Sequence, residues 1–145
     1  MSVISLTYAV KRGAFAIQNR MNLPFGTGNL NGCVGIIASL SDNSHFCAHL
    51  DVRQEPTSQS ERDELSQAVE SWLTWVIPLA NVTSMWYSSS GSLASTFCII
   101  AGIKSACPGA LGHNRPTLYF SEGGDMVAND HMIKCGKFVA GTCTF

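Results

Sequence analysis

The alternation of side-chain types across residues 33–51 constrains the fold of this chain more than any other feature. Successive side chains of a β-strand point to opposite faces of a sheet. The even-numbered residues of the two strand-like runs are apolar: Val34, Ile36, Ala38, Leu40, Phe46, Ala48 and Leu50. Nearly every reactive group belongs to the odd-numbered set, which comprises Cys33, Gly35, Ile37, Ser39, His45, Cys47, His49 and Asp51. We therefore expect a hairpin with one face packed in a core and the other face displaying its chemistry at the surface.

The same alternation determines the register of the hairpin. Both strands can present even-numbered residues to one core only if paired positions share parity, which requires an odd-numbered loop. A loop of residues 41–43 meets this requirement, because Asn43 tolerates the left-handed conformation that such loops need. Cys33 then faces Asp51 and is the diagonal neighbour of His49. Diagonal neighbours lie about 7–8 Å apart at the backbone, so a thiol and an imidazole can reach each other.

Elsewhere the patterns predict one helix and several strands. Ser58 and Glu61 fit a capping box, with Ser60 as a competing cap, and apolar residues then recur at helical spacing up to about Val76. Short apolar runs separated by turns predict strands at residues 3–10, 13–18, 82–87, 95–103, 117–120 and 137–145. This combination indicates an α+β fold, a mixed and largely antiparallel β-sandwich or sheet with one main helix packed on it.

Length and charge limit the classes of function. With 145 residues the chain is expected to form a single catalytic domain over residues 1–145. Its net charge is -1 and it has no basic cluster, so we expect neither nucleic acid nor an anionic membrane as a partner. The first residues lack the pattern of a signal peptide, and no apolar run approaches the length of a membrane span. We therefore expect a soluble, leaderless protein.

The six cysteines and the neighbouring histidines allow two other interpretations. An even number of cysteines is compatible with three disulfides, and hence with a secreted binding module that has no catalytic activity. No two cysteines have CxxC spacing, however, and free thiols in a reducing compartment are favoured. The run His45-x-Cys47-x-His49 could bind metal, but its histidines would lie about 13 Å apart on a regular strand, too far to share one ion. A site that uses two of these side chains together with distant ligands stays open as the lesser alternative, and we expect no metal and no cofactor.

The hairpin and the loop before it also carry a recognisable motif. Phe25-x-Thr27-x-x-Leu30-x-Gly32-Cys33 is followed by His49-Leu50-Asp51. This motif resembles the Leu-x-Gly-Cys glutamine deamidase toxins, the family of Burkholderia lethal factor and the catalytic domain of cytotoxic necrotizing factor. The resemblance covers residues 25–51, and the rest of the chain agrees with the family only in the gross order of elements.

The resemblance implies a catalytic triad of Cys33, His49 and Thr27. Cys33 would attack the carboxamide of a protein glutamine with His49 as base, and water would hydrolyse the thioester to leave glutamate. Thr27 would accept the other imidazole N–H, a role for which Asp51 on the same face of the hairpin competes. Gly32 would let the backbone approach closely, and the Cys33 N–H would donate to the oxyanion.

The resemblance also implies a protein partner. The substrate would be a host protein with an exposed glutamine, by analogy a translation factor or a small GTPase, reached after delivery into the host cytoplasm. We expect Cys33 and His49 at a shallow edge of the sheet, which suits a protruding primary amide. A cysteine hydrolase of other specificity stays open as an alternative, although papain-like proteases separate Cys and His by well over a hundred residues.

Overall fold

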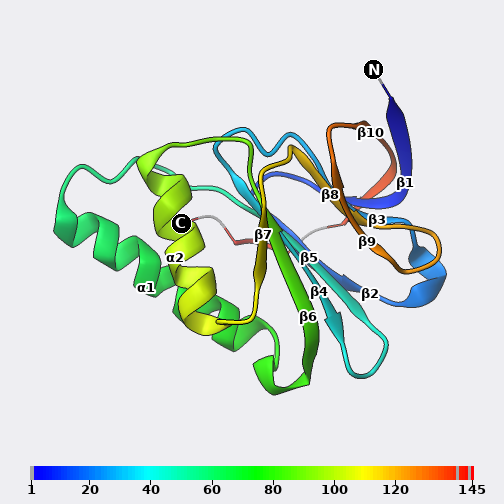
Figure 1. The fold of residues 1–145 in the computed structure, drawn as a ribbon, viewed down its shortest axis with the longest axis horizontal. Helices are drawn as coiled ribbons and strands as arrows, with labels where there is room; N and C mark the ends of the chain where they lie inside the picture. Colours follow the sequence, from blue (N-terminus) through cyan, green and yellow to red (C-terminus); the bar gives the residue numbers. More distant parts are fainter. Residues whose placement is uncertain (1, 140, 144) are drawn as a thin grey trace.

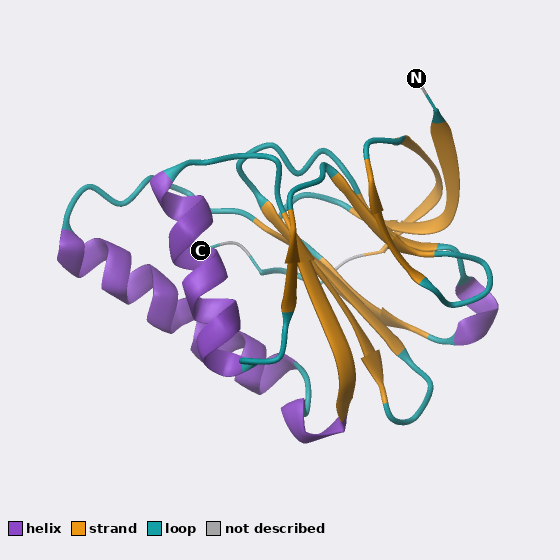
Figure 2. Ribbon diagram, viewed as in Figure 1, coloured by secondary structure: helices purple, strands orange, loops and turns teal. Residues whose placement is uncertain are grey.

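The computed structural model, which describes residues 2–139, 141–143 and 145, has three layers. Two five-stranded sheets pack face to face, and two helices cover the outer face of the second sheet (Figure 1, Figure 2). The first sheet has the order β10 (Met132–Val139), β1 (Val3–Val10), β3 (Phe25–Thr27), β8 (Thr117–Phe120) and β9 (Met126–Asn129). The second has the order β2 (Phe15–Gln18), β5 (His45–Leu50), β4 (Val34–Leu40), β6 (Val82–Ser88) and β7 (Leu111–His113). Both sheets mix parallel and antiparallel pairs, and the predicted α+β class is confirmed.

The β4–β5 hairpin at the centre of the second sheet has the predicted register. Gly35 pairs with His49 in the antiparallel ladder. The Leu40 N–H donates to the Ser44 carbonyl at 3.0 Å, which leaves an odd-numbered loop between the strands. Asn43 in this loop has a φ of 67°, in the left-handed region that asparagine tolerates. The alternation of side chains therefore predicted both the loop and the pairing correctly.

Both faces of this hairpin are buried, which corrects the expectation that the odd-numbered face lies at the surface. The even-numbered face packs against buried side chains of the two helices, among them Val69, Leu73, Ile99 and Ile103. The odd-numbered face packs against the first sheet, where its neighbours include Phe25, Leu30, Leu118 and Phe120. The expectation was wrong because strand alternation within one hairpin does not reveal that a second sheet covers the other side. The Cys33–Asp51 end of the odd face is partly open, as is Ser39 at its other end.

The first helix, α1 (Gln59–Val76), confirms the predicted cap. Ser58 is the N-cap, and its hydroxyl oxygen accepts the Glu61 N–H at 3.1 Å. The Glu61 carboxylate accepts in return from the N–H of Thr57 at 3.2 Å. These bonds satisfy N–H groups that have no partner inside the helix, so α1 begins directly after Ser58.

The second helix, α2 (Ala94–Ala106), occupies the segment that was predicted as a strand at 95–103, so that prediction was wrong. Its buried residues recur with helical spacing: Ser95, Thr96, Cys98, Ile99, Gly102 and Ile103. A continuous apolar run lacks the alternation of a half-buried strand and fits a buried helix equally well. At Gly102 the helices approach so closely that a Cβ would lie 2.5 Å from the Ser66 carbonyl oxygen. None of the helices among the described residues is long and apolar enough to cross a lipid bilayer.

The other predicted strands are found, three of them with changed limits. Those at residues 3–10 and 117–120 are confirmed, the one at 82–87 extends by one residue to Ser88, and the one at 13–18 begins only at Phe15. Gly13 precedes it in a turn with a φ of 75°. The last strand ends at Val139 rather than extending over 137–145, and residues 140 and 144 of that prediction lie outside the described residues.

Candidate active site

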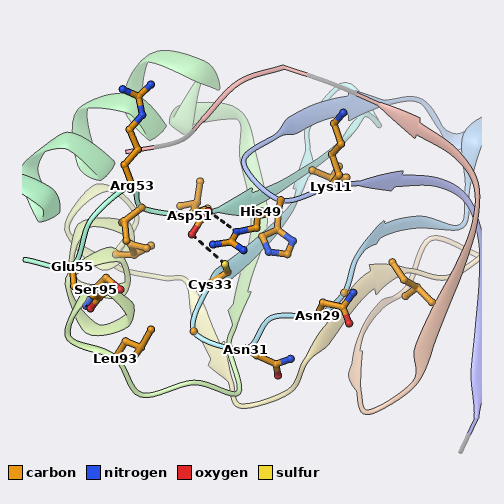
Figure 3. Close-up of a pocket in the computed structure, with 18 of the residues that line it drawn as sticks. Lys11, Asn29, Asn31, Cys33, His49, Asp51, Arg53, Glu55, Leu93 and Ser95 are labelled. Carbon is orange, nitrogen blue, oxygen red and sulfur yellow. Dashed lines mark hydrogen bonds and ion pairs between the residues drawn. The ribbon is translucent and has the colours of Figure 1, made fainter.

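A pocket of about 840 Å³ opens at the end of the β4–β5 hairpin (Figure 3). Its walls come from the turn after β1, the loop before β4, the residues after β5, the start of α2 and part of β10. Cys33, His49 and Asp51 all line this pocket, so the structure brings together the groups that the register places side by side. His49 is only 3% exposed, which differs from the shallow sheet edge that we expected.

The hydrogen bonds of Thr27 determine which nitrogen of His49 carries the proton. The Thr27 hydroxyl oxygen lies 2.6 Å from the Val10 carbonyl oxygen and 2.8 Å from Nδ1 of His49. A carbonyl can only accept, so the hydroxyl proton goes to Val10 and the hydroxyl oxygen accepts the Nδ1–H of the imidazole. Neutral His49 is therefore protonated at Nδ1 and has its lone pair on Nε2. Nε2 has no hydrogen-bond partner among the described residues, which leaves it free to act as a base.

Burial of His49 keeps the ring in its basic, uncharged form. Burial lowers the pKa of His49 to about 4, and the opposing effect of the Asp51 carboxylate is smaller. Gly35 stands opposite His49 on β4, and a Cβ there would lie 2.8 Å from Leu30 and 3.2 Å from Thr27. A glycine at this position therefore makes room for the side chains that enclose the imidazole, including the threonine that holds it.

The thiol of Cys33 donates to Asp51 and, among the described residues, makes no hydrogen bond to His49. Its Sγ lies 3.5 Å from Oδ1 of Asp51, and Nε of Arg12 lies 2.5 Å from Oδ2 of the same carboxylate (Figure 3). Burial raises the pKa of Cys33 to about 11, and the charge and hydrogen bond of Asp51 add to the effect. The resting site therefore contains a thiol and a neutral imidazole, and not an ion pair of thiolate and imidazolium.

These contacts separate the two residues that competed to orient His49. Thr27 holds the imidazole, whereas Asp51 is bound by Arg12 and faces the thiol of Cys33. Burial alone would raise the pKa of Asp51, but the hydrogen bond and charge of Arg12 keep it below its ordinary value. Asp51 is thus a charged neighbour of the sulfur rather than a partner of the ring.

The turn that presents Cys33 is held by the first turn of α2 and by the segment before it. Gly32 has a φ of 99°, and its carbonyl accepts the Thr96 hydroxyl at 2.7 Å. A Cβ on Gly91 would lie 2.2 Å from the Gly32 nitrogen, so glycine is required for this close approach. The Cys33 N–H makes no backbone hydrogen bond within the described part of the chain. This N–H is therefore not engaged by the described backbone, which is a condition for the oxyanion role that the resemblance implies.

The other side chains of the run His45-x-Cys47-x-His49 lie in the core. The His45 ring packs edge-on against Phe120 with a centroid distance of 4.6 Å, and Cys47 is fully buried between the sheets. Within residues 2–139, 141–143 and 145, no three His, Cys, Asp or Glu side chains form a group that could hold a metal ion. All six cysteines are free thiols.

Sequence reasoning missed two groups that complete the site. The Val10 carbonyl fixes the Thr27 hydroxyl, and Arg12 binds the carboxylate beside the sulfur. Both lie at or just after the end of β1, far from the hairpin in sequence. Every residue has a backbone carbonyl, so the residue type at position 10 does not indicate that its carbonyl binds Thr27. The only available signal was the presence of Arg12 among few charged residues directly after a strand.

Comparison of the chain with protein-family models finds none that matches. Comparison with curated proteins likewise finds no match. The geometry of the pocket and the motif in residues 25–51 therefore carry the functional proposal.

Proposed function

We propose that this protein is a glutamine deamidase that acts on proteins, with Cys33 as nucleophile and His49 as base. The observation that carries the proposal is the pair of hydrogen bonds made by Thr27, which leave an unpaired Nε2 on a buried neutral imidazole. A thiol lines the same pocket. The resemblance of the motif to the Leu-x-Gly-Cys deamidases supplies the reaction type, and the free thiols give no support to a disulfide-bonded module.

The first half-reaction forms a thioester. Cys33 exchanges its hydrogen bond with Asp51 for one with Nε2 of His49, a tightening that substrate binding often induces at such sites. The pKa of the Cys33 thiol is about 11 and that of the His49 imidazole about 4, so transfer of the thiol proton to the imidazole is unfavourable by itself. The transfer therefore occurs together with attack of the sulfur on the glutamine carbonyl carbon. As the S–C bond forms, the carbonyl electron pair moves to oxygen, where the Cys33 N–H donates.

The second half-reaction releases glutamate. The imidazolium of His49 gives its proton to the amide nitrogen, the C–N bond breaks and ammonia leaves. A water molecule then gives a proton to Nε2 and adds its oxygen to the thioester carbon. The C–S bond breaks as the sulfur of Cys33 leaves and takes the proton from the His49 imidazolium. The net reaction converts glutamine and water to glutamate and ammonia, with no cofactor. By the same resemblance, the substrate is a host protein such as a translation factor or a small GTPase.

Peptide mapping of a treated lysate tests this function. Wild-type protein, Cys33→Ala and Cys107→Ala are each incubated with eukaryotic cell lysate, and peptides are mapped by mass while free ammonia is measured. Cys107 is the matched control, because it is also a half-exposed free thiol but does not line the pocket. We expect a glutamine converted to glutamate in an uncut protein with the wild type and with Cys107→Ala. A cleaved target, or the same conversion with Cys33→Ala, would contradict the proposal.

A further inference from the structure

The pocket concentrates basic residues in a chain that is slightly acidic overall. The sequence has nine basic and ten acidic residues. The pocket, in contrast, is lined by three basic side chains and two acidic ones: Lys11, Arg12, Arg53, Asp51 and Glu55. The local balance of charge is therefore reversed at the site itself, which is where a substrate must bind.

Both acidic side chains of the pocket are already engaged. Asp51 is bound by Arg12, and Oε1 of Glu55 accepts the Ser95 N–H at 3.1 Å, at the positive end of α2. Lys11 and Arg53 make no ion pair among the described residues. In the close-up the two side chains lie on either side of the Cys33–His49 group (Figure 3). Two exposed positive charges that form no ion pair within the described part of the chain thus flank the reacting groups.

Apolar side chains border the same pocket. Leu93 is 52% exposed and Phe138 is 63% exposed, and both line the pocket at its rim. Leu93 and Phe138 are thus apolar surface that a macromolecule bound at the pocket can cover. A small amide would leave these side chains in water, whereas a segment of protein can cover them.

Building on the proposed function, we propose that the enzyme selects a protein segment in which acidic residues flank the target glutamine. The acidic side chains pair with Lys11 and Arg53 while the carboxamide reaches Cys33, and apolar side chains of the same segment pack on Leu93 or on Phe138. The occupant is thus an acidic segment of a protein substrate, identified by charge complementarity. Such pairing contributes to affinity and to the rate of encounter, and salt weakens it.

Binding of three matched peptides to Cys33→Ala tests this selection without requiring turnover. Each peptide contains one glutamine next to leucine, and the flanking residues are all Glu, all Ala or all Lys. We expect the glutamate peptide to bind roughly fivefold to tenfold more tightly than the alanine peptide at low salt, and the lysine peptide to bind most weakly. High salt should remove most of the difference. Fluorescence anisotropy of labelled peptides gives the Kd values.

Charge reversal separates the role of the two cations from damage to the fold. Lys11→Glu with Arg53→Glu should invert the order of the peptides, which mere destabilisation would not do. Arg20→Glu with Lys104→Glu is the matched control, because it changes the net charge equally at exposed positions outside the pocket and should keep the wild-type order. Equal Kd values for the three peptides, or the same order in both double variants, would overturn this inference even if deamidation is observed. Absence of deamidation together with the expected order of Kd values would overturn the proposed function alone.

Discussion

The two faces of the β4–β5 hairpin are both buried, yet only one of them is optimised for stability. On the even-numbered face the side chains are apolar, and Phe46 packs near Trp72 of α1 with ring centroids 6.2 Å apart. The odd-numbered face buries two histidines against the first sheet, and a ring nitrogen of each has no hydrogen-bond partner among the described residues. Burying an unpaired polar group costs stability. The odd face thus has a lower contribution to the free energy of unfolding, because it buries the imidazole of His49 that serves as the proposed base.

This comparison explains why the site lies at one end of the hairpin only. Along most of the odd face, the first sheet excludes water, as it does around Ile37 and Cys47. At the Cys33–Asp51 end the covering is incomplete and the pocket begins. His49 is positioned at this boundary, where it is buried enough to stay neutral but still lines the pocket. The two faces should therefore respond differently to substitution.

The largest effect is expected for Cys33→Ala on the open end of the odd face. Loss of the nucleophile should lower turnover by about 10⁴-fold or more, to the background of the assay. Because the side chain is half-buried and small, the free energy of unfolding should change by less than about 1 kcal/mol. Ammonia release and urea unfolding measure the two quantities. Retained turnover would remove Cys33 from the mechanism.

On the even face, Phe46→Ala should have the opposite effect. Removing a fully buried aromatic side chain from a packed core costs about 3–5 kcal/mol of unfolding free energy. Turnover per folded molecule should stay near the wild-type value, because no group of the pocket is changed. Urea unfolding and an active-site titration of the folded fraction provide the measurement. A selective loss of turnover without loss of stability would show that the two faces are not separable in this way.

The buried histidine should make stability depend on pH. The pKa of His49 is about 4 in the folded protein against an ordinary value of 6.5, so between these values the unfolded chain binds more protons. Unfolding free energy should therefore rise with pH over this window and be lost as pH falls through it, by on the order of 3 kcal/mol. His49→Gln should flatten the profile measured by urea unfolding from pH 6.5 to pH 4. An unchanged slope would show that His49 is not buried in its neutral form.

A smaller effect distinguishes Thr27 from Asp51. Thr27→Val keeps the shape but removes the acceptor of the His49 Nδ1–H, so turnover should fall about 10- to 100-fold. Thr27→Ser retains the hydroxyl and serves as the control. Asp51→Asn should slow turnover less and should lower the pKa of Cys33, measured as faster alkylation of this thiol by iodoacetamide. The reverse ranking of turnover would transfer the orienting role to Asp51.

The sequence was informative where the signal is local. The register of the hairpin follows from side-chain parity together with Asn43, and the start of α1 follows from Ser58 and Glu61, since each depends on residues a few positions apart. The strand predicted at residues 95–103 failed because an unbroken apolar run has no period that separates a buried strand from a buried helix.

The missing parts of the site are those that come from tertiary packing. Val10 and Arg12 reach the site only because the first sheet packs on the odd face of the hairpin, and Thr27, which the motif named, reaches His49 for the same reason. The depth of His49 and its lowered pKa have the same origin. Parity could place Cys33 beside the histidine, but it could not show which of two polar neighbours would hold the ring.

The most direct test of the account is the protonation state of His49 observed by nitrogen NMR. In protein labelled at the histidine ring nitrogens, neutral His49 should carry its proton on Nδ1, with a bare Nε2, and should titrate near pH 4. Thr27→Val should perturb this resonance pattern, whereas Asp51→Asn should leave the tautomer unchanged. A ring that carries its proton on Nε2 in the wild type, or that titrates at its ordinary pKa, would contradict the claim that Thr27 prepares His49 as the base for Cys33.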